Sequence, residues 1–274
     1  MAEDAVRASN SVNPLGAARA TELVPIGDAI DLLRAIKSPS EIATLTAAIE
    51  LTDAVFVDVT SDLRPGTTER EVAWRIEREI RERGAEGISF PPIVASGPYG
   101  ARPHHSPGDR PLAAGEPIVI DMGARLGGYH ADLTRTVWMG DADDRLREVY
   151  GVVLAAQHAA LGVLRAGVTA KDADTAAREV ITAAGFGDYF THGLGHGVGL
   201  RIHEAPSSSQ TSEDVLQAGQ VLTVEPGVYI PDWGGVRIED VGVLEDDGFR
   251  VLTRAPKIDV TMGGNGQVKP TNGS

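Results

Sequence analysis

The chain has 274 residues, 42% of them hydrophobic, which is enough for the core of one large domain or two small ones. Its net charge of −14, with basic residues scattered among acids, excludes a nucleic-acid partner, and the lack of cysteine excludes disulfides and cysteine-ligated zinc. No apolar run reaches membrane-spanning length and the first residues lack an export-signal pattern, so we expect no membrane insertion and a cytoplasmic location.

Two helices are predicted after a flexible leader. Residues 1–20 are polar and have no hydrophobic period, which is typical of a flexible segment. Ser38–Glu41 is a helix-start signal, and apolar residues at helical spacing then predict a helix over about 40–62. Thr68 can cap a second helix, which Gly84 ends. The sequence therefore predicts an αα unit.

A hairpin carrying two aspartates is predicted next. The apolar run Pro117–Ile120 indicates a buried strand with Asp121 at its end. The turn at Leu126–Gly128 leads into a second strand over 129–138, which places Asp132 across the hairpin from Asp121. Two carboxylates held this close raise a pKa or bind a cation, and a hard divalent metal suits oxygen ligands. The alternative is that each aspartate only caps a turn.

Three segments recur at nearly constant spacing, which indicates an internal duplication. Each half contains two helices, a loop with a histidine, and strands with carboxylates. This order predicts an α+β fold with pseudo-two-fold symmetry. The matching segments are Leu63–Thr68 with Leu164–Thr169, 101 residues apart; Arg102–Pro107 with Arg201–Pro206, 99 apart; and Leu112–Gly115 with Leu216–Gly219, 104 apart.

The duplication brings polar residues together in pairs. Repeat-equivalent residues lie near the pseudo-two-fold axis, so these pairs are expected to converge on one site. Four acids there would repel one another unless cations neutralise them, which favours a metal site over turn capping. The pairs are Asp121 with Glu225, Asp132 with Glu239, and His104 with His203.

A glycine-rich segment, His192–Gly199, contains one further candidate ligand. Its glycines allow the backbone to approach a site closely, and His196 has no counterpart in the first half. A phosphate cradle is the alternative, but the G-x-G-x-x-G pattern is not met and no helix is predicted to follow directly. We therefore interpret His196 as a metal ligand. His105, His130 and His158 are interpreted as structural or locally hydrogen-bonded residues.

At these positions the sequence closely resembles the pita-bread metallopeptidases, in the branch of Xaa-Pro dipeptidases (prolidases) and Xaa-Pro aminopeptidases. The resemblance runs from about Arg34 to Leu252 and implies a pita-bread fold with a catalytic domain over 36–256. Residues 1–35 then form a leader and the remnant of an interdomain junction, with structure beginning near Leu23, and 257–274 form a tail. The motifs concerned are Ile36–Ile42, Ala95–Gly97 with Pro103 and His104, Asp121 with Asp132, His192–Glu204, Val224–Tyr229 and Gly235–Asp240.

The resemblance also implies the site's chemistry. Two divalent metal ions are expected, with the oxygen-rich ligand set favouring Mn²⁺ and Co²⁺ or Zn²⁺ as alternatives. The expected substrate is a peptide with proline in second position, and a homodimer is possible. The implied metal ligands are Asp121, Asp132, His196, Glu225 and Glu239; the catalytic residues are His104, His203 and Glu225; and the substrate-contacting or supporting residues are His192 and Arg237.

Two other functions remain open from the sequence. The nearer alternative is a methionine aminopeptidase or a broader aminopeptidase on the same fold. Relatives of the proline-directed branch usually carry a separate N-terminal domain, and only about 20 to 35 residues precede the predicted catalytic domain here. The more distant alternative is a peptide-binding module without catalysis.

Overall fold

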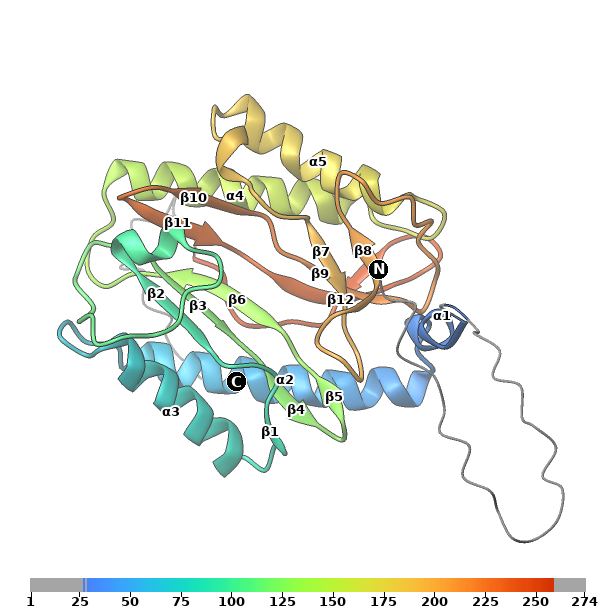
Figure 1. The fold of residues 1–274 in the computed structure, drawn as a ribbon, viewed down its shortest axis with the longest axis horizontal. Helices are drawn as coiled ribbons and strands as arrows, with labels where there is room; N and C mark the ends of the chain where they lie inside the picture. The colour runs from blue at the N-terminus through green and yellow to red at the C-terminus, as the bar shows by residue number, and fades with distance from the viewer. Residues whose placement is uncertain (1–26, 28, 259–274) are drawn as a thin grey trace, which may run out of the picture.

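The computed structural model describes residues 27 and 29–258 (Figure 1). The predicted leader over 1–20, the expected start of structure near Leu23 and most of the predicted tail over 257–274 lie outside the described residues. Within the stretch assigned to the junction, helix α1 (Ala29–Ala35) forms and packs against strand β8 (Glu204–Ser208). This helix was not predicted from the sequence.

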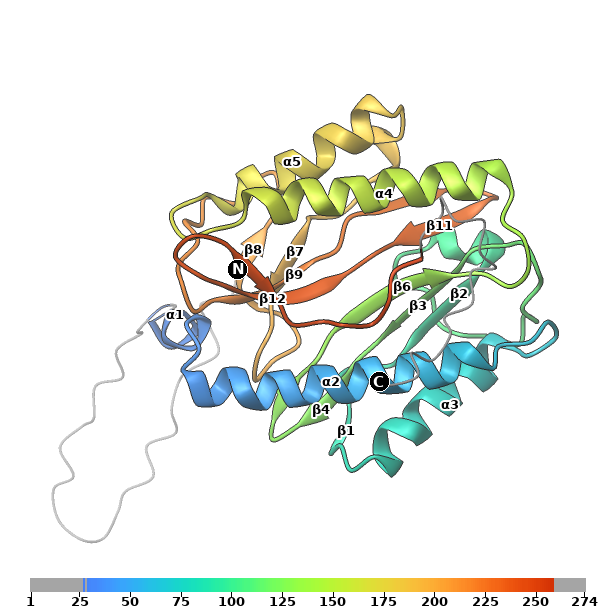
Figure 2. The ribbon, with the colours of Figure 1, turned by 180° about the vertical axis from the view of Figure 1, so that it is seen from behind.

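Two pairs of helices enclose the strands. Helices α2 and α3 lie along one side of the molecule and α4 and α5 along the opposite side, with the strands between them (Figures 1 and 2). Within the described part of the chain, no helix has both the length and the apolarity needed to cross a membrane. The bounds are α2 Pro39–Ser61, α3 Glu69–Glu82, α4 Asp144–Val163 and α5 Ala170–Ala183.

Both predicted N-terminal helices are confirmed, and their first turns show why they begin where they do. Ser38 and Thr68 each accept a hydrogen bond from the backbone of the residue three positions on, Glu41 and Glu71. Each glutamate side chain in turn accepts from the backbone N–H of its cap. This reciprocal capping satisfies backbone donors that a helix start leaves unpaired.

The described strands form four antiparallel sheets. The two larger sheets have the strand orders β2-β3-β6 and β13-β12-β9-β7-β8, and the smaller ones β1-β4-β5 and β10-β11. The bounds are β1 Gly87–Ile88, β2 Ile93–Ser96, β3 Ile118–Met122, β4 Ala124–Leu126, β5 Tyr129–His130, β6 Leu133–Val137, β7 Gly195–Gly197, β9 Val221–Val224, β10 Gly227–Ile230, β11 Gly234–Arg237, β12 Asp240–Leu244 and β13 Phe249–Val251. Two 3₁₀ turns, η1 (Gly97–Ala101) and η2 (Gly187–Tyr189), complete the elements.

The internal duplication is visible in equivalent backbone contacts. Gly66 donates from its N–H to the carbonyl of Leu112 at 2.9 Å, and Gly167 donates to Leu216 at 2.8 Å. Both glycines have a positive φ, 93° and 87°, which a residue with a side chain rarely adopts. The α+β architecture with two related halves is therefore as predicted.

The predicted hairpin is correct in its turn and wrong in its second strand. Gly127 and Gly128 have φ values of 57° and 79° and form the two-residue turn between β4 and β5. The strand expected over 129–138 is divided into β5 and β6 instead. A Cβ on Gly123 would lie 1.9 Å from the carbonyl oxygen of Ala131, so the two backbones come close together beside this interruption. Asp132 lies in this interruption, directly before β6.

Three apolar clusters hold the sheets in place. One packs α2 and α3 on the β2-β3-β6 sheet, one packs α4 and α5 on the other side, and one joins α2 to β12. Fully burying one such aliphatic or aromatic side chain contributes about 1.5–3 kcal/mol. Representative buried residues are Phe56, Ile76 and Ile120 in the first cluster, Val153, Ile181 and Val224 in the second, and Ile49 and Val241 in the third.

Candidate metal centre

A cavity of about 560 Å³ is lined by residues of both large sheets. The backbone N–H of Glu239 donates to the carbonyl of Thr134 at 3.0 Å, which joins the two sheets beside the cavity. Every site residue predicted from the sequence lines this one cavity: His104, Asp121, Asp132, His192, His196, His203, Glu225, Arg237 and Glu239. The fold therefore brings together residues that are far apart in the sequence.

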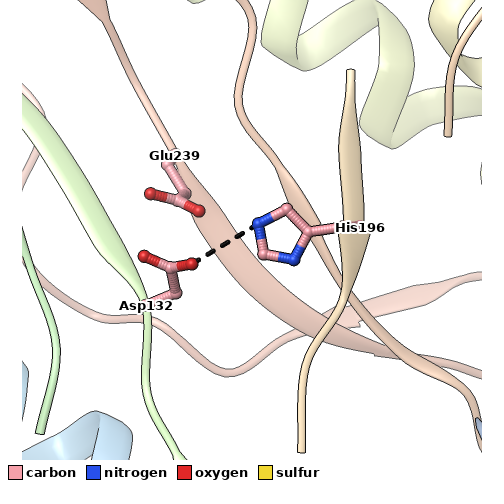
Figure 3. Close-up of side chains that lie close together, drawn as sticks. All are labelled: Asp132, His196 and Glu239. Carbon is pink, nitrogen blue, oxygen red and sulfur yellow. Dashed lines mark ion pairs between the residues drawn. The ribbon is translucent and has the colours of Figure 1, made fainter. Parts of the chain in front are cut away.

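Asp132, His196 and Glu239 lie close together in the cavity and form a group that could hold a metal ion (Figure 3). One candidate ligand atom from each lies within 4.8 Å of the other two. The Nε2 atom of His196, in the middle of β7, is 3.6 Å from Oδ2 of Asp132. These three side chains come from different strands or strand ends, and oxygen and imidazole nitrogen are suitable ligands for a divalent ion.

The other two predicted ligands lie against this group. Glu225 follows β9, and its Oε1 atom is 3.3 Å from Nε2 of His196. Asp121 is on β3, opposite Thr134 of β6 in the ladder. The symmetry argument from the sequence is thus consistent with the geometry, because both acids of each half line the same cavity.

Arg237 connects the acids of the two halves. Its Nη2 atom donates to Oδ2 of Asp121 at 2.6 Å, and its Nε atom donates to Oγ1 of Thr134 at 3.0 Å. Thr134 in turn donates from Oγ1 to Oε2 of Glu239 at 2.8 Å. Arg237 is only 4% exposed, so the geometry favours a supporting role over direct contact with substrate.

The buried acids of this site have opposed pKa shifts. Burial raises the pKa of Asp121, and burial together with neighbouring carboxylates raises the pKa values of Asp132 and Glu239 well above the usual range. For Glu225, burial by itself would raise the pKa, but the hydrogen bond and charge of His196 outweigh burial and lower the pKa to about 2. A cation among these groups would favour their ionised forms.

Two oxygen atoms support the fit of a metal to this site. Among the described residues, Oδ1 of Asp121 and Oε1 of Glu239 are buried without a hydrogen-bond partner. Buried carboxylate oxygens normally have a partner, because removing them from water is costly. Both atoms belong to predicted ligands, so the donor set present here fits divalent cations.

The three predicted site histidines other than His196 differ in how they are held. His192 is hydrogen-bonded through Nε2 to the hydroxyl of Tyr229 at 2.8 Å, and burial lowers its pKa. His203 packs its ring against His196 with the ring centres 4.3 Å apart, and burial lowers its pKa as well. His104 also faces the cavity, from the loop after η1.

Two of the three histidines interpreted as structural or locally hydrogen-bonded have local partners, and the third is exposed on a helix. His105 contacts Glu69 at 2.8 Å, His130 contacts the carbonyl of Gly199 at 3.3 Å, and His158 is exposed on α4. His105 lines the cavity edge, but its ring nitrogen is engaged by Glu69.

Sequence reasoning missed two threonines that hold the predicted ligands. Thr134 donates to Glu239, and Thr223 donates from Oγ1 to Oε1 of Glu225 at 3.1 Å. Thr134 lies two residues after Asp132, and Thr223 lies two residues before Glu225. Residues two apart on a strand share a face, so this spacing is the signal that could have identified them.

The duplicated α+β fold and the cavity of acids and histidines define a metal-dependent hydrolase of the pita-bread type. The model of metallopeptidase family M24 matches residues 43–246, and the chain belongs to this family. The pita-bread fold expected from the sequence is confirmed. Membership implies divalent metal ions and peptide substrates.

Relatives of two kinds match most of the chain. An Xaa-Pro dipeptidase of Pyrococcus furiosus is 43% identical over 236 residues, covering 86% of this chain and 68% of its own. An uncharacterized peptidase of Bacillus subtilis is also 43% identical over 236 residues, covering 86% and 67%. The crystal structure of an X-Pro aminopeptidase from Thermotoga maritima matches with a TM-score of 0.83 at 42% identity, covering 84% of this chain and 66% of that one. The chain thus spans about two thirds of these relatives' length.

Proposed function

We propose that this chain hydrolyses the peptide bond between an N-terminal residue and a proline in second position. The observation that carries the proposal is the group of four acids, two of them buried and two partly buried, with His196 at a cavity of about 560 Å³. The names of two relatives, Xaa-Pro dipeptidase and X-Pro aminopeptidase, support proline as the second residue.

Two divalent ions would be held by Asp121, Asp132, His196, Glu225 and Glu239. Four carboxylates with one imidazole form a hard ligand set, which favours Mn²⁺, with Co²⁺ and Zn²⁺ as alternatives. When bound, such ions supply Lewis acidity and lower the pKa of a water molecule.

The chain's own residues would then move protons and orient the peptide. Glu225, which lies beside His196 with Oε1 3.3 Å from its Nε2 atom, would accept the proton of the attacking water. His203 would donate a hydrogen bond to the oxygen of the tetrahedral intermediate. His104 would contact the scissile amide nitrogen and assist departure of the amine. His192, held by Tyr229, would contact substrate from the cavity wall.

The lining of the cavity also includes apolar residues, which support proline as the second residue of the substrate. The amide before proline has no N–H, so the site needs no acceptor for it. An apolar surface beside the acids would receive the ring without leaving a polar group unpaired. The apolar residues that line the cavity are Phe90, Pro91, Ile93, Pro103 and Ile202.

A substrate panel tests this function. Ala-Pro, an Ala-Pro-led tetrapeptide, Met-Ala-Ser and Ala-Ala-Ala should be assayed with Mn²⁺ after the metal content is measured. Turnover confined to the two proline peptides supports the proposal. Preference for Met-Ala-Ser or equal cleavage of all peptides would favour the methionine or broad aminopeptidase. Peptide binding without turnover, with metal present, would favour a non-catalytic module. The cytoplasmic location and the homodimer stay predictions from the sequence.

A further inference from the structure

The residue that follows each proposed catalytic histidine has a buried side chain, and a partner of opposite chemistry, acid or base, holds that side chain in place. His104 and His203 are exposed towards the cavity, and neither imidazole makes a hydrogen bond within the described ranges. The side chains that follow them, His105 and Glu204, are only 8% and 3% exposed. In each loop, therefore, a histidine whose imidazole makes no such hydrogen bond is followed by a residue whose side chain is held in place.

Glu204 is fixed by two cations from the segment before α2. Its Oε1 atom accepts from Nζ of Lys37 at 2.7 Å, and its Oε2 atom accepts from Nη2 of Arg34 at 2.5 Å. The side chain of Lys37 is 1% exposed. A Cβ on Gly199 would lie 2.5 Å from Oε1 of Glu204, so glycine at that position leaves room for the ion pair.

The backbone of Lys37 is hydrogen-bonded to the chain before β9, which fixes the position of Lys37 as a partner of Glu204. Its backbone N–H donates to the carbonyl of Gly219 at 2.9 Å, and Ile36 forms a bridge with Gln220. The ion pair thus connects the chain before α2, the loop before β9 and the loop that carries His203.

His105 is fixed in the same manner in the first half. Its Nε2 atom lies 2.8 Å from Oε2 of Glu69, the first residue of α3, which is fully buried. Glu69 also accepts from the backbone N–H of Ser96 at 2.9 Å and of Gly108 at 3.2 Å. His105 and Glu204 occupy repeat-equivalent positions. Their chemistry is reversed, because the loop of the first half carries a histidine held by an acid, and the loop of the second half carries an acid held by basic residues.

We propose that Glu204, held by Lys37, is a positioning residue for His203, and that His105, held by Glu69, does the same for His104. The proposal rests on the proposed function. An imidazole without hydrogen bonds takes its position from its backbone, and the next Cα is only about 3.8 Å away. Displacing a group by about 1 Å from its productive place can slow a reaction about 100-fold.

The alternative is that the Lys37–Glu204 pair only stabilises the fold. Lys37→Met removes the cation but keeps the side-chain length, and Lys37→Arg keeps the charge. Glu204→Gln is the second variant in case Lys37→Met folds poorly, because it keeps the shape and one acceptor. Lys171→Met, on the exposed face of α5, is the matched control.

Kinetics in two backgrounds separate the alternatives. Lys37→Met should lower kcat about 10- to 100-fold with metal content unchanged, Lys37→Arg should recover most of it, and Lys171→Met should have no effect. In a His203→Ala background, Lys37→Met should cause no further loss. An equal fractional loss in both backgrounds, or an unchanged kcat when Lys37→Met is made in the otherwise wild-type protein, would overturn the positioning role.

Hydrogen exchange gives a readout that does not depend on activity. Amides of residues 198–204 should exchange faster in Lys37→Met and in Glu204→Gln than in wild type or Lys171→Met, while amides of α4 stay unchanged. Unchanged exchange over 198–204 would show that the Lys37–Glu204 ion pair does not hold this loop in place. If the wild-type protein with Mn²⁺ cleaves no proline peptide, the proposed function fails, and this exchange experiment still decides whether Glu204 holds the loop.

Discussion

Arg237 donates a hydrogen bond from Nη2 to Oδ2 of Asp121 at 2.6 Å, and the two side chains are 4% and 13% exposed. One oxygen of Asp121 is therefore committed to the arginine, while Oδ1 has no partner among the described residues. A partner that fixes a ligating carboxylate in this way determines where its free oxygen points.

Arg237→Met should weaken metal binding and activity. It removes the hydrogen bonds to Asp121 and Thr134, so the negative charge of the Asp121 carboxylate loses its cationic partner. We expect metal affinity or kcat/KM to fall about 10- to 100-fold, the usual scale for losing a residue that orients a ligand. Isothermal titration with Mn²⁺ measures the first quantity. Arg250→Met, at an exposed ion pair with Glu245, should leave both unchanged.

Asp132→Asn and Glu239→Gln should each lower the number of ions bound per chain. Both residues belong to the group of three candidate ligands whose donor atoms lie within 4.8 Å of one another, and an amide is a weaker ligand than a carboxylate. Metal content after desalting measures the effect, with the exposed Asp109→Asn as control. Two tightly bound ions retained in both variants would show that the ligand assignment is wrong.

His104→Ala and His203→Ala should keep the metal and lose turnover. Loss of an acid–base or oxyanion-binding group slows a reaction roughly 100-fold or more. Steady-state kinetics on Ala-Pro, with metal content measured on the same samples, test both variants. Metal loss in either one would make that histidine a ligand, and near-normal turnover would remove it from the mechanism.

Removing metal should lower the melting temperature. Asp121, Asp132, Glu225 and Glu239 surround one cavity, and an ion that binds only the folded state stabilises it by mass action. Calorimetry of the protein with excess Mn²⁺ and after complete chelation measures the shift. Equal melting temperatures in the two samples would contradict a site formed by folding.

Asp53 should make stability decline as the pH rises from about 4 to 6. Burial raises its pKa to about 6, against about 3.9 for a free side chain, although the backbone N–H of Arg254 donates to its Oδ2 at 2.7 Å. Between these values the folded state holds a proton that the unfolded state has lost, so stability decreases as the pH passes through the folded pKa.

Asp53→Asn removes this decline. The stability of the variant relative to wild type should rise by about 2 to 3 kcal/mol between pH 4 and pH 7. Urea unfolding at several pH values in one metal buffer measures the difference. Glu50→Gln, at an exposed residue of the same helix, should show a smaller change, and a constant difference for Asp53→Asn would refute the assignment.

Sequence by itself determined the two helix starts and the duplication, and it predicted which residues line the cavity. Capping residues act on the backbone within three positions, so Ser38 and Thr68 could be identified as helix caps from their immediate neighbours. The duplication was visible because the same turn chemistry recurs at Gly66 and Gly167. The site residues were predicted from that repeat and from a motif-level resemblance; all of them line one cavity, and their roles stay predictions.

Only the tertiary structure decided how those residues are held. The close approach of Gly123 to Ala131, beside the interruption before Asp132, is a contact that no local sequence pattern records. The bonds from Arg237 to Asp121 and from Lys37 to Glu204 join residues 116 and 167 positions apart. Such pairs depend on how the sheets and helices pack, because burial and orientation, and not residue type alone, decide which charges meet.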